Sequence, residues 1–287
     1  MKRITRCGAL LALLLSGSVT ADEVYTGRQA WEIARKTTCG TLEAGVTRFG
    51  VWQGKAYSRV PGERDRHLFN LIGVNTRQCA DVQDPDKGEG FRSVSREVML
   101  YLDPETGALL DQWENPWTGQ TVEVLHVAND PVNMRAPRFA TDGGEMKQRR
   151  YGDLLVSASE VPLFYDNPLG GDFQDYVGGT YHAMEIFDTF YPADELLDSK
   201  RRLERSWIAW IRVAQWLPWM EMGSRPGLMV FNATGSSTFE RGSIPEPLRS
   251  VLKDRYPSYF EPPPLDDPRP NETSWTVFRK HIEQKGD

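Results

Sequence analysis

The amino-acid sequence predicts a mostly β protein: an antiparallel meander that closes into a lipocalin-like β-barrel, with short helices near the N-terminus and the C-terminus. Short runs rich in β-branched and aromatic residues recur along the chain, which contains nine Trp, ten Tyr and twelve Phe. Gly and Pro separate these runs, as turns separate strands. One turn pattern, with Pro near its start and Thr-Gly at its end, occurs twice, its glycines 12 residues apart. About ten strands joined by short turns favour a barrel or sandwich, because closure removes exposed strand edges.

The first 21 residues have the three parts of a secretory signal peptide. Lys2 and Arg3 begin a positive region, residues 9–15 are apolar, and small residues end at Ala21. This pattern predicts a periplasmic or secreted protein. No apolar run reaches the roughly 18–20 residues that span a bilayer, so we expect no stable membrane insertion. No linker divides the remainder, and residues 22–287 are interpreted as one barrel-like domain.

Two cysteines, Cys39 and Cys79, remain after the signal peptide. In an oxidising compartment they can form a disulfide, whereas two buried free thiols are an equally open alternative. The sequence says nothing of the distance between them.

The predicted elements begin with a helix over residues 26–38, which Thr26 can cap and Gly40 ends. Strands are predicted at 45–58, 67–74, 95–102, 108–114, 120–127, 152–159, 178–188, 206–216 and 227–234. The two repeated turns, at 103–107 and 115–119, would join 95–102, 108–114 and 120–127 into three sequential antiparallel strands.

Residues 206–216 can also be drawn as a helix, but their Trp and Ile content favours a strand. Short helices are predicted at 247–256 and 274–284, the second with Asn271 or Thr273 as its N-cap. Pro262 to Pro270 form an extended connector between them.

Three segments of the chain resemble a bacterial family known as a domain of unknown function, DUF1838. They are YLDPETGALLDQWENPWTGQTVEVLHVANDPVN at 101–133, SWIAWIRVAQWLPWMEMG at 206–223 and NETSWTVFRK at 271–280. The resemblance covers roughly residues 25–280. It implies a mixed, mostly β fold and assigns neither an activity nor catalytic residues.

Two histidines are the first candidates for chemistry. Strand alternation places His126 with Val122 and Val124, and His182 with Met184 and Ile186, so each His is expected on an apolar inner face. A core histidine that is satisfied by a carbonyl or water is the alternative for either.

The residues that follow His126 supply further candidates. Asp130 or Asn129 could orient His126 or a substrate hydroxyl, although Asn-Asp-Pro also forms an ordinary turn. Tyr181 has the opposite parity to His182 and could stabilise developing negative charge.

Tryptophans and one arginine are the candidates for ligand binding. In a barrel that encloses a ligand, aromatic residues line the cavity, although core packing is their default role. The candidates are Trp113, Trp117, Trp210 and Trp216. Arg212 lies in the apolar strand 206–216 and must pair with a carboxylate of the protein, which we favour, or with an anionic ligand group.

Composition and missing motifs narrow the function. The net charge of −6 and the lack of a Lys/Arg cluster argue against nucleic acid. No phosphate-binding loop, nucleotide-binding glycine motif or zinc-protease motif is present. His126 and His182 with Asp130 or Glu185 lack a metal-binding spacing, so neither a metal nor a cofactor is expected.

Three functions remain open, and the sequence says nothing of the oligomeric state. The first is an exported barrel that binds a small apolar or aromatic molecule in its cavity. The second is a cofactor-independent lyase or isomerase that uses His126 or His182 as acid and base. The third is an envelope module that contacts carbohydrate through exposed Trp.

Overall fold

The computed structural model describes residues 22–134, 136–169 and 179–286. The predicted signal peptide, residues 1–21, lies outside the described residues, as does Gly178 at the start of one predicted strand. The strands are β1 (Asp22–Thr26), β2 (Arg48–Arg59), β3 (His67–Asp84), β4 (Gly88–Leu102), β5 (Gln112–Glu114), β6 (Thr121–Glu123), β7 (Val127–Asn129), β8 (Arg138–Phe139), β9 (Glu145–Tyr151), β10 (Leu154–Asp166), β11 (Thr180–Pro192), β12 (Ser206–Ala214) and β13 (Leu228–Thr238). The helices are α1 (Gly27–Cys39), α2 (Ala193–Leu197), α3 (Leu248–Arg255) and α4 (Ser274–Gly286).

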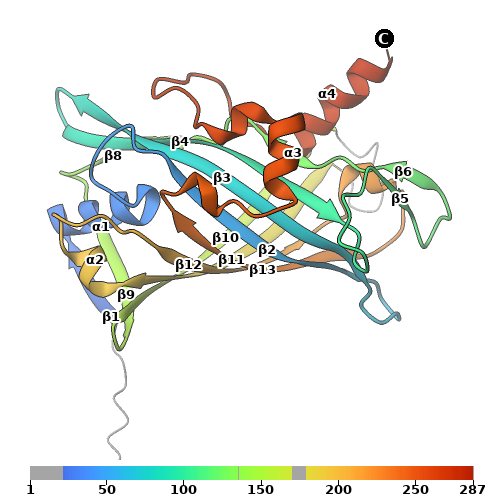
Figure 1. Cartoon of the computed structure of the whole chain (residues 1–287), viewed down its shortest axis with the longest axis horizontal. Helices are drawn as coiled ribbons and strands as arrows, with labels where there is room; N and C mark the ends of the chain where they lie inside the picture. The colour runs from blue at the N-terminus through green and yellow to red at the C-terminus, as the bar shows by residue number, and fades with distance from the viewer. Residues whose placement is uncertain (1–21, 135, 170–178, 287) are drawn as a thin grey trace, which may run out of the picture.

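One antiparallel sheet organises the chain. Its strands follow the order β1-β9-β10-β11-β12-β13-β2-β3-β4-β7, and β8 adds to β4. The sheet is strongly curved, so that β3 and β4 cross the direction of β10 to β13 in Figure 1. The predicted mostly β, antiparallel architecture is therefore confirmed.

The predicted closed barrel is not found among the described strands. The sheet path has two ends, β1 and β7, and no pairing joins them in the parts of the chain that the structure describes. Helix α1 lies between the two sides of the curved sheet: the Trp31 indole N–H donates to the Arg138 carbonyl in β8 (2.9 Å), while Ile33 packs with Tyr25 of β1. A helix thus occupies the place where further strand pairing would close a barrel.

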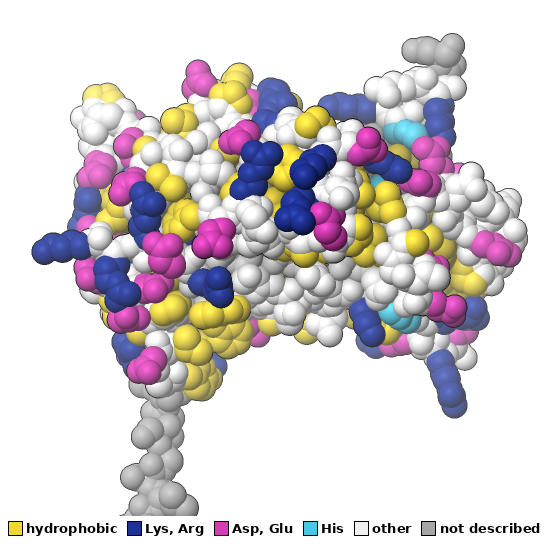
Figure 2. Space-filling model, viewed as in Figure 1, with side chains coloured by type: hydrophobic (Ala, Val, Ile, Leu, Met, Phe, Trp, Pro, Cys, Tyr) yellow, Lys and Arg dark blue, Asp and Glu magenta, His cyan; other side chains and the backbone are white. Residues whose placement is uncertain are grey.

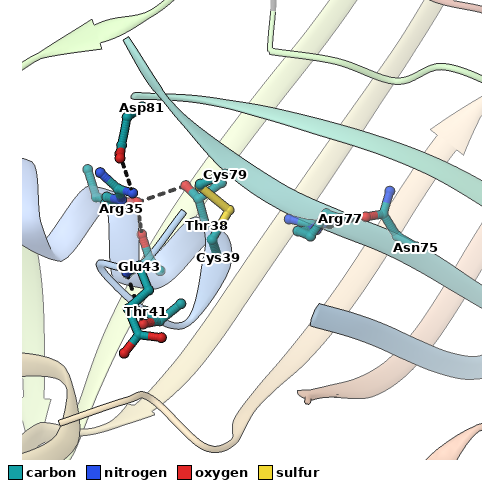
Figure 3. The surroundings of a disulfide bond; sticks show 11 residues. Arg35, Thr38, Cys39, Thr41, Glu43, Asn75, Arg77, Cys79 and Asp81 are labelled. Atoms are coloured by element: carbon teal, nitrogen blue, oxygen red, sulfur yellow. Dashed lines mark hydrogen bonds and ion pairs between the residues drawn. A yellow bond between two sulfur atoms is a disulfide. The ribbon is translucent and has the colours of Figure 1, made fainter. Parts of the chain in front are cut away.

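The Cys39–Cys79 disulfide ties the end of α1 to β3. It is accompanied by an ion pair between Arg35 of α1 and Asp81 of β3, with a nitrogen–oxygen distance of 2.6 Å (Figure 3). The predicted disulfide is therefore present, and it holds α1 against the sheet.

The helix and strand predictions are largely confirmed. Helix α1 forms as expected and ends at Gly40 with φ of 76°, although Thr26, its N-cap, makes no side-chain cap hydrogen bond. Residues 206–214 form β12, which decides against the helical alternative. At α4 the N-cap is Thr273, whose hydroxyl accepts from the Thr276 N–H (3.2 Å).

The three-strand meander requires a correction. Both turns form, with φ of 72° at Gly107 and 70° at Gly119. However, 108–114 and 120–127 shrink to β5 and β6, which form a separate two-stranded sheet, and a single bridge from Leu102 to Leu109 joins this region to β4. The hairpin leaves the main sheet because its apolar side chains, Trp113 and Val122, pack into the hydrophobic core instead.

The two faces of the curved sheet are covered differently. On the outer face of β3 and β4, helix α3 and the 3-10 helix Pro257–Phe260 cover an apolar cluster that includes Val74, Val98 and Leu252. On the inner face, the β5–β6 hairpin, α4 and the 3-10 helix Pro218–Met220 gather at one end, opposite α1 and α2 (Figure 1). We call this the packed end. It is centred on Phe69, Tyr101 and Trp219, all buried.

Candidate functional site on the inner face of the sheet

Strand register identifies the residues that face the inside. Trp52 of β2 lies opposite Gly73 of β3 on one side and Gly235 of β13 on the other. Because side chains alternate along strands, Trp52 shares its face with Gly50, Gly54 and the buried core residue Ala56. The nearest positions on this face, along β2 and on the two adjacent strands, are therefore glycines without side chains.

The glycines let the Trp52 indole lie flat on the sheet. A Cβ atom at Gly73 would stand 2.3 Å from a ring carbon of Trp52, and one at Gly235 would stand 2.9 Å from its Cβ. At Gly73 the Trp52 ring would have to shift, whereas at Gly235 the added Cβ would also stand 2.3 Å from the Val51 backbone oxygen, which a shift of the ring does not relieve. Glycine at these positions is a requirement of the Trp52 packing.

Six inward side chains form what we call the inner polar zone: Trp52, Arg77, Glu97, Glu185, Trp210 and Arg212. All six are half-buried, although they lie on the concave face of the sheet. At the packed end, by contrast, inward side chains are fully covered. Two inward positions of β10 also stay exposed, Ser159 and Val161, beyond the segment where β9 pairs with β10. The inner face is therefore open to solvent along this edge.

The two tryptophans of the inner polar zone present aromatic carbon. The indole N–H groups of Trp52 and Trp210 are buried and have no hydrogen-bond partner among the described residues. Since both side chains remain half-exposed, the exposed part is the carbon of the rings. Trp210 is flanked by Phe187 and Phe231, whose ring centres lie 6.5 and 5.9 Å away.

Arg212 is paired inside the protein, as we expected. Its Nη1 lies 3.1 Å from Oε1 of Glu185 on the adjacent strand, and its Nη2 donates to the Tyr181 hydroxyl. Burial raises the pKa of Glu185, an effect that the Arg212 charge opposes and the Glu97 charge reinforces. Tyr101 of β4 and Tyr181 of β11 belong to one hydrophobic cluster, so these two strands, distant in the sheet, face the same interior.

Arg77 of β3 has no such carboxylate partner. Its Nε donates to the Asn75 side-chain oxygen, 2.7 Å away, and in the described part of the chain no carboxylate oxygen lies within 4 Å of it. Glu97, opposite Asn75 in the sheet, instead accepts a hydrogen bond from the Asn129 amide (2.9 Å). Figure 3 shows Arg77 and Asn75 on β3, beyond the disulfide.

His126 is buried outside the inner polar zone. Its Nδ1 accepts the backbone N–H of Tyr101 (3.1 Å), a donor at the edge of β4 beyond the pairing with β7, and its ring stacks on the Tyr101 ring. Burial lowers the pKa of His126 to about 4, so the imidazole is neutral at pH 7. Its Nε2 is also buried and has no hydrogen-bond partner among the described residues.

His182 lies on the opposite face from the one expected. The predicted alternation on β11 is correct, but Tyr181 and Glu185 point inward, whereas His182 is exposed and meets Phe164 edge to face on the outer surface. The error arises because both faces of this strand carry apolar residues. The structure therefore does not bring His126 and His182 into one pocket.

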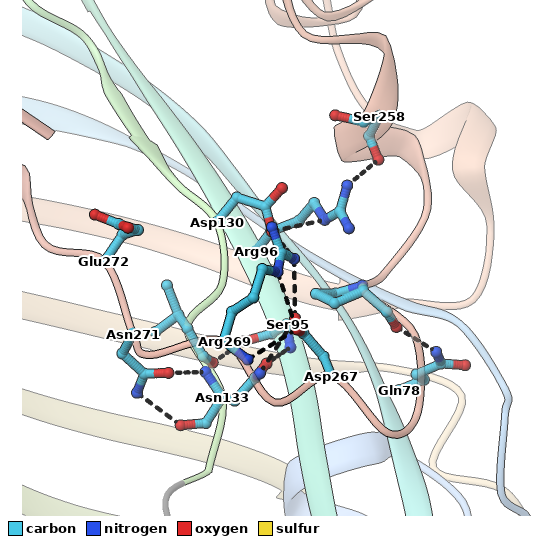
Figure 4. A network of polar contacts seen from close by, with 12 residues as sticks. Gln78, Ser95, Arg96, Asp130, Asn133, Ser258, Asp267, Arg269, Asn271 and Glu272 are labelled. Atoms are coloured by element: carbon cyan, nitrogen blue, oxygen red, sulfur yellow. Dashed lines mark hydrogen bonds and ion pairs between the residues drawn. The ribbon is translucent and has the colours of Figure 1, made fainter. Parts of the chain in front are cut away.

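Asp130 belongs to an ion-pair network that fastens the C-terminal segment to β4 (Figure 4). One of its oxygens lies 2.8 Å from Nη2 of Arg269 and 3.5 Å from Nε of Arg96. Arg269 also binds Asp267, and the hydrogen bonds of Asn271 to Asn133 continue the network. Asp130 therefore neutralises arginines and does not orient His126.

Three of the four candidate tryptophans belong to the packed end. Trp113 and Trp216 are buried, and the half-buried Trp117 lies between them with its indole N–H donating to Glu63 (3.0 Å). Trp210 alone of the four lies in the inner polar zone. Of the other predicted residues, Arg212 belongs to that zone, Tyr181 accepts from Arg212, and Asn129 donates to Glu97.

Sequence reasoning missed Trp52, Asn75, Arg77, Glu97 and the inward position of Glu185. A signal for Trp52 was present: glycines two residues before and two residues after it leave the ring without neighbours on its own strand. No comparable signal marks Arg77, because its lack of a partner depends on which strands face β3.

The outer surface has a depression of its own. It is open, with a volume of about 650 Å³, and is lined by Gln53, Trp207, Thr234 and Ser236 among others. Trp207 is 42% exposed there and lies on the same strand as Trp210, on the opposite face. None of the predicted catalytic residues lines this depression.

Figure 2 shows acidic and basic side chains intermingled over the face in view, without a large patch of one sign. Among the described residues, no helix is long and apolar enough to cross a membrane. No three His, Cys, Asp or Glu side chains in the described ranges are grouped so that they could hold a metal ion.

The fold and site define a mostly β protein in which one curved antiparallel sheet presents a half-exposed aromatic and charged inner face. The model of the family described as "Protein of unknown function (DUF1838)" matches residues 45–282, and the chain belongs to this family. This confirms the resemblance seen in the sequence.

Proposed function

We propose that the protein binds a small apolar or aromatic molecule on the inner face of its curved sheet, at Trp52 and Trp210. One observation supports this above all: both rings keep aromatic carbon half-exposed on a concave, inward surface while their N–H groups are buried. Ligand sites combine such concave aromatic walls with a few polar groups. Arg212, Glu185 and Tyr181 supply those groups beside Trp210.

Titration with the neutral fluorophore N-phenyl-1-naphthylamine tests this proposal. Trp210→Ala should weaken binding about tenfold, since removing an aromatic contact of roughly 1–2 kcal/mol corresponds to a change of that order. Trp207→Ala is the matched control, because Trp207 lies on the same strand but on the outer face. Equal affinity of Trp210→Ala and the parent would overturn the proposal. Loss of binding in Trp207→Ala alone would move the site to the outer depression and favour the carbohydrate-contacting alternative.

A second candidate is proton transfer on the bound molecule, as in a cofactor-independent lyase or isomerase. The supporting observation is Glu185, whose pKa is raised by burial and whose carboxylate lies beside Arg212. A carboxyl group with a raised pKa suits general acid–base catalysis near neutral pH. In this role Glu185 replaces the two histidines. Incubation of the parent and Glu185→Gln with a small-molecule extract, followed by mass spectrometry, should show conversion by the parent alone.

We also propose that the protein is exported, with cleavage after Ala21. Two features support export: the tripartite sequence of residues 1–21 and the Cys39–Cys79 disulfide, a bond typical of oxidising compartments. Cleavage there leaves β1, which begins at Asp22, intact. N-terminal sequencing of the periplasmic fraction should read Asp22 first, and a mature chain that still contains residues 1–21 would contradict export.

A further inference from the structure

Two arginines on β2 and β3, the buried Arg48 and the half-buried Arg77, are the basis of this inference. Arg48 and Arg77 lie directly opposite each other in the register of these strands. Arg48 is 2% exposed and donates only to neutral groups, the Leu203 carbonyl and the Ser206 hydroxyl. In the described residues no carboxylate oxygen lies within 4 Å of either guanidinium. Two neighbouring cations are thus held inside the sheet without an ion pair.

Carboxylates act on these two arginines only from a distance. Glu97 is the carboxylate that acts electrostatically on Arg77, and its side chain already accepts from Asn129. Burial lowers the pKa of Arg48 to about 10, and the charge of Arg77 contributes to this shift. Burial likewise lowers the pKa of Arg77. Glu204 and Glu195 also act electrostatically on Arg48, but none of these carboxylates forms an ion pair with either guanidinium. A buried cation is costly unless an anion accompanies it.

Arg77 lies on the same face of the sheet as Trp52. It lies four residues beyond Gly73, the position opposite Trp52, which corresponds to roughly 13 Å of strand. The hydrogen bond from Nε to Asn75, two residues back, draws the side chain along β3 toward Gly73. It also occupies Nε, whereas the two terminal nitrogens, Nη1 and Nη2, make no hydrogen bond or ion pair among the described residues. These two nitrogens form the fork that binds a planar carboxylate.

We propose that the ligand of the inner polar zone is an aromatic carboxylate, with its ring against Trp52 and its carboxylate on Arg77. This assignment rests on the proposed aromatic binding function and adds the chemical class of the ligand. Arg212 is not the anchor, because Glu185 and Tyr181 already engage its terminal nitrogens. Asn75 is a positioning residue, which aims Arg77 through the contact with Nε.

A pair of competitors that differ by one charge tests the proposal. Bound N-phenyl-1-naphthylamine is displaced by 2-naphthoate, a carboxylate at pH 7, or by its neutral analogue 2-naphthamide. The parent should prefer 2-naphthoate about tenfold or more, as a charge-assisted hydrogen bond of roughly 1.5–3 kcal/mol implies.

Two variants test whether Arg77 is the source of the preference for 2-naphthoate. Arg77→Gln removes the cation, and Asn75→Asp keeps it but supplies an internal carboxylate partner, so both should bind the two competitors equally. Arg64→Gln removes the same charge from an exposed position and should retain the preference. Melting temperatures of all variants verify folding. Because Asn75→Asp keeps the arginine and adds an ion pair, it remains informative if Arg77→Gln is unstable.

The outcomes separate the two proposals. Failure of the parent to bind N-phenyl-1-naphthylamine overturns the proposed function and this inference with it. Binding of the fluorophore with equal affinity for the two competitors overturns the aromatic carboxylate alone. A preference that survives in both Arg77→Gln and Asn75→Asp overturns the role of Arg77.

Discussion

The packed end and the inner polar zone lie on the same concave face, yet they are built on different principles. At the packed end, Trp219 meets Phe69, Tyr101 and Trp113 with ring centres 5.5–5.9 Å apart, and all four are buried. In the inner polar zone Trp52 lies on glycine, and charged residues stand half-exposed around it. The difference teaches that the concave face is densely packed at one end, whereas its middle keeps aromatic and charged side chains half-exposed.

Truncating one tryptophan in each region tests whether the two regions differ in packing. Trp219→Ala should cost about 3–5 kcal/mol of unfolding free energy, because the surrounding rings cannot fill the space that it leaves. Trp210→Ala should cost less, about 1–2 kcal/mol, since part of its surface is already in water. Urea unfolding followed by circular dichroism measures both. Equal costs would mean that the inner polar zone is packed as tightly as the packed end.

Acid should destabilise the packed end through His126. Its folded-state pKa of about 4 lies below the ordinary 6.5, so between these values the unfolded chain binds the proton and the folded chain does not. Above pH 6.5 His126 therefore does not lower the unfolding free energy. As the pH decreases below 6.5, the unfolding free energy falls, by up to about 3 kcal/mol near pH 4.

Unfolding free energies at pH 7 and pH 4.5, compared between the parent and His126→Asn, measure this contribution. Asn can still accept from the Tyr101 N–H but does not titrate. A variant that loses as much stability as the parent on acidification would show that His126 is not the cause.

Two glycine-to-alanine substitutions test how much space is available around Gly54 and Gly73. Gly54→Ala would place its Cβ 2.2 Å from the Asn232 carbonyl oxygen, which is backbone, and should cost about 1–3 kcal/mol. Gly73→Ala meets only the Trp52 ring, which can shift into the unfilled zone, so it should cost less. Thermal melts compare the two, and Trp fluorescence should change only in Gly73→Ala. A larger loss of thermal stability in Gly73→Ala than in Gly54→Ala would mean that the Trp52 ring has no room to move.

The smallest expected effect on stability belongs to Arg77. Arg77→Met should change the unfolding free energy by less than about 1 kcal/mol, or stabilise the fold, because it removes a half-buried cation that lacks an ion pair. Arg212, which has an ion pair, is the comparison. Arg212→Met should lower the unfolding free energy more than Arg77→Met, since it leaves Glu185 without its partner. Chemical denaturation of both variants distinguishes them, and a large loss in Arg77→Met would reveal a stabilising partner for this cation.

Much of the secondary structure was predictable, because it depends on neighbouring residues. The turn at Gly107, the end of α1 at Gly40 and the strand at 206–214 follow from local preferences for backbone conformation. The extra length of β3, from residue 75 to residue 84, was missed because polar residues such as Asn75 and Arg77 interrupt its apolar pattern. Their side chains point into the inner polar zone, where charge is tolerated.

The candidate site was predictable only in part. Trp210 and Arg212 could be selected because a charge within an apolar strand requires a partner, and Glu185 is that partner. The expected inner position of His182 was wrong, because parity separates two faces without identifying the inner one.

The sequence by itself determined which residues share a face of each strand, where the chain turns, and that the two cysteines could pair. Only the tertiary structure decided that α1 lies between the two sides of the sheet, that Tyr181 and Glu185 face inward, and that Arg77 has no carboxylate beside it. The physical reason is that strand alternation has a period of two and treats both faces alike, whereas enclosure and charge pairing depend on the curvature of the sheet. That curvature brings β4 opposite β11, two strands that no local pattern connects.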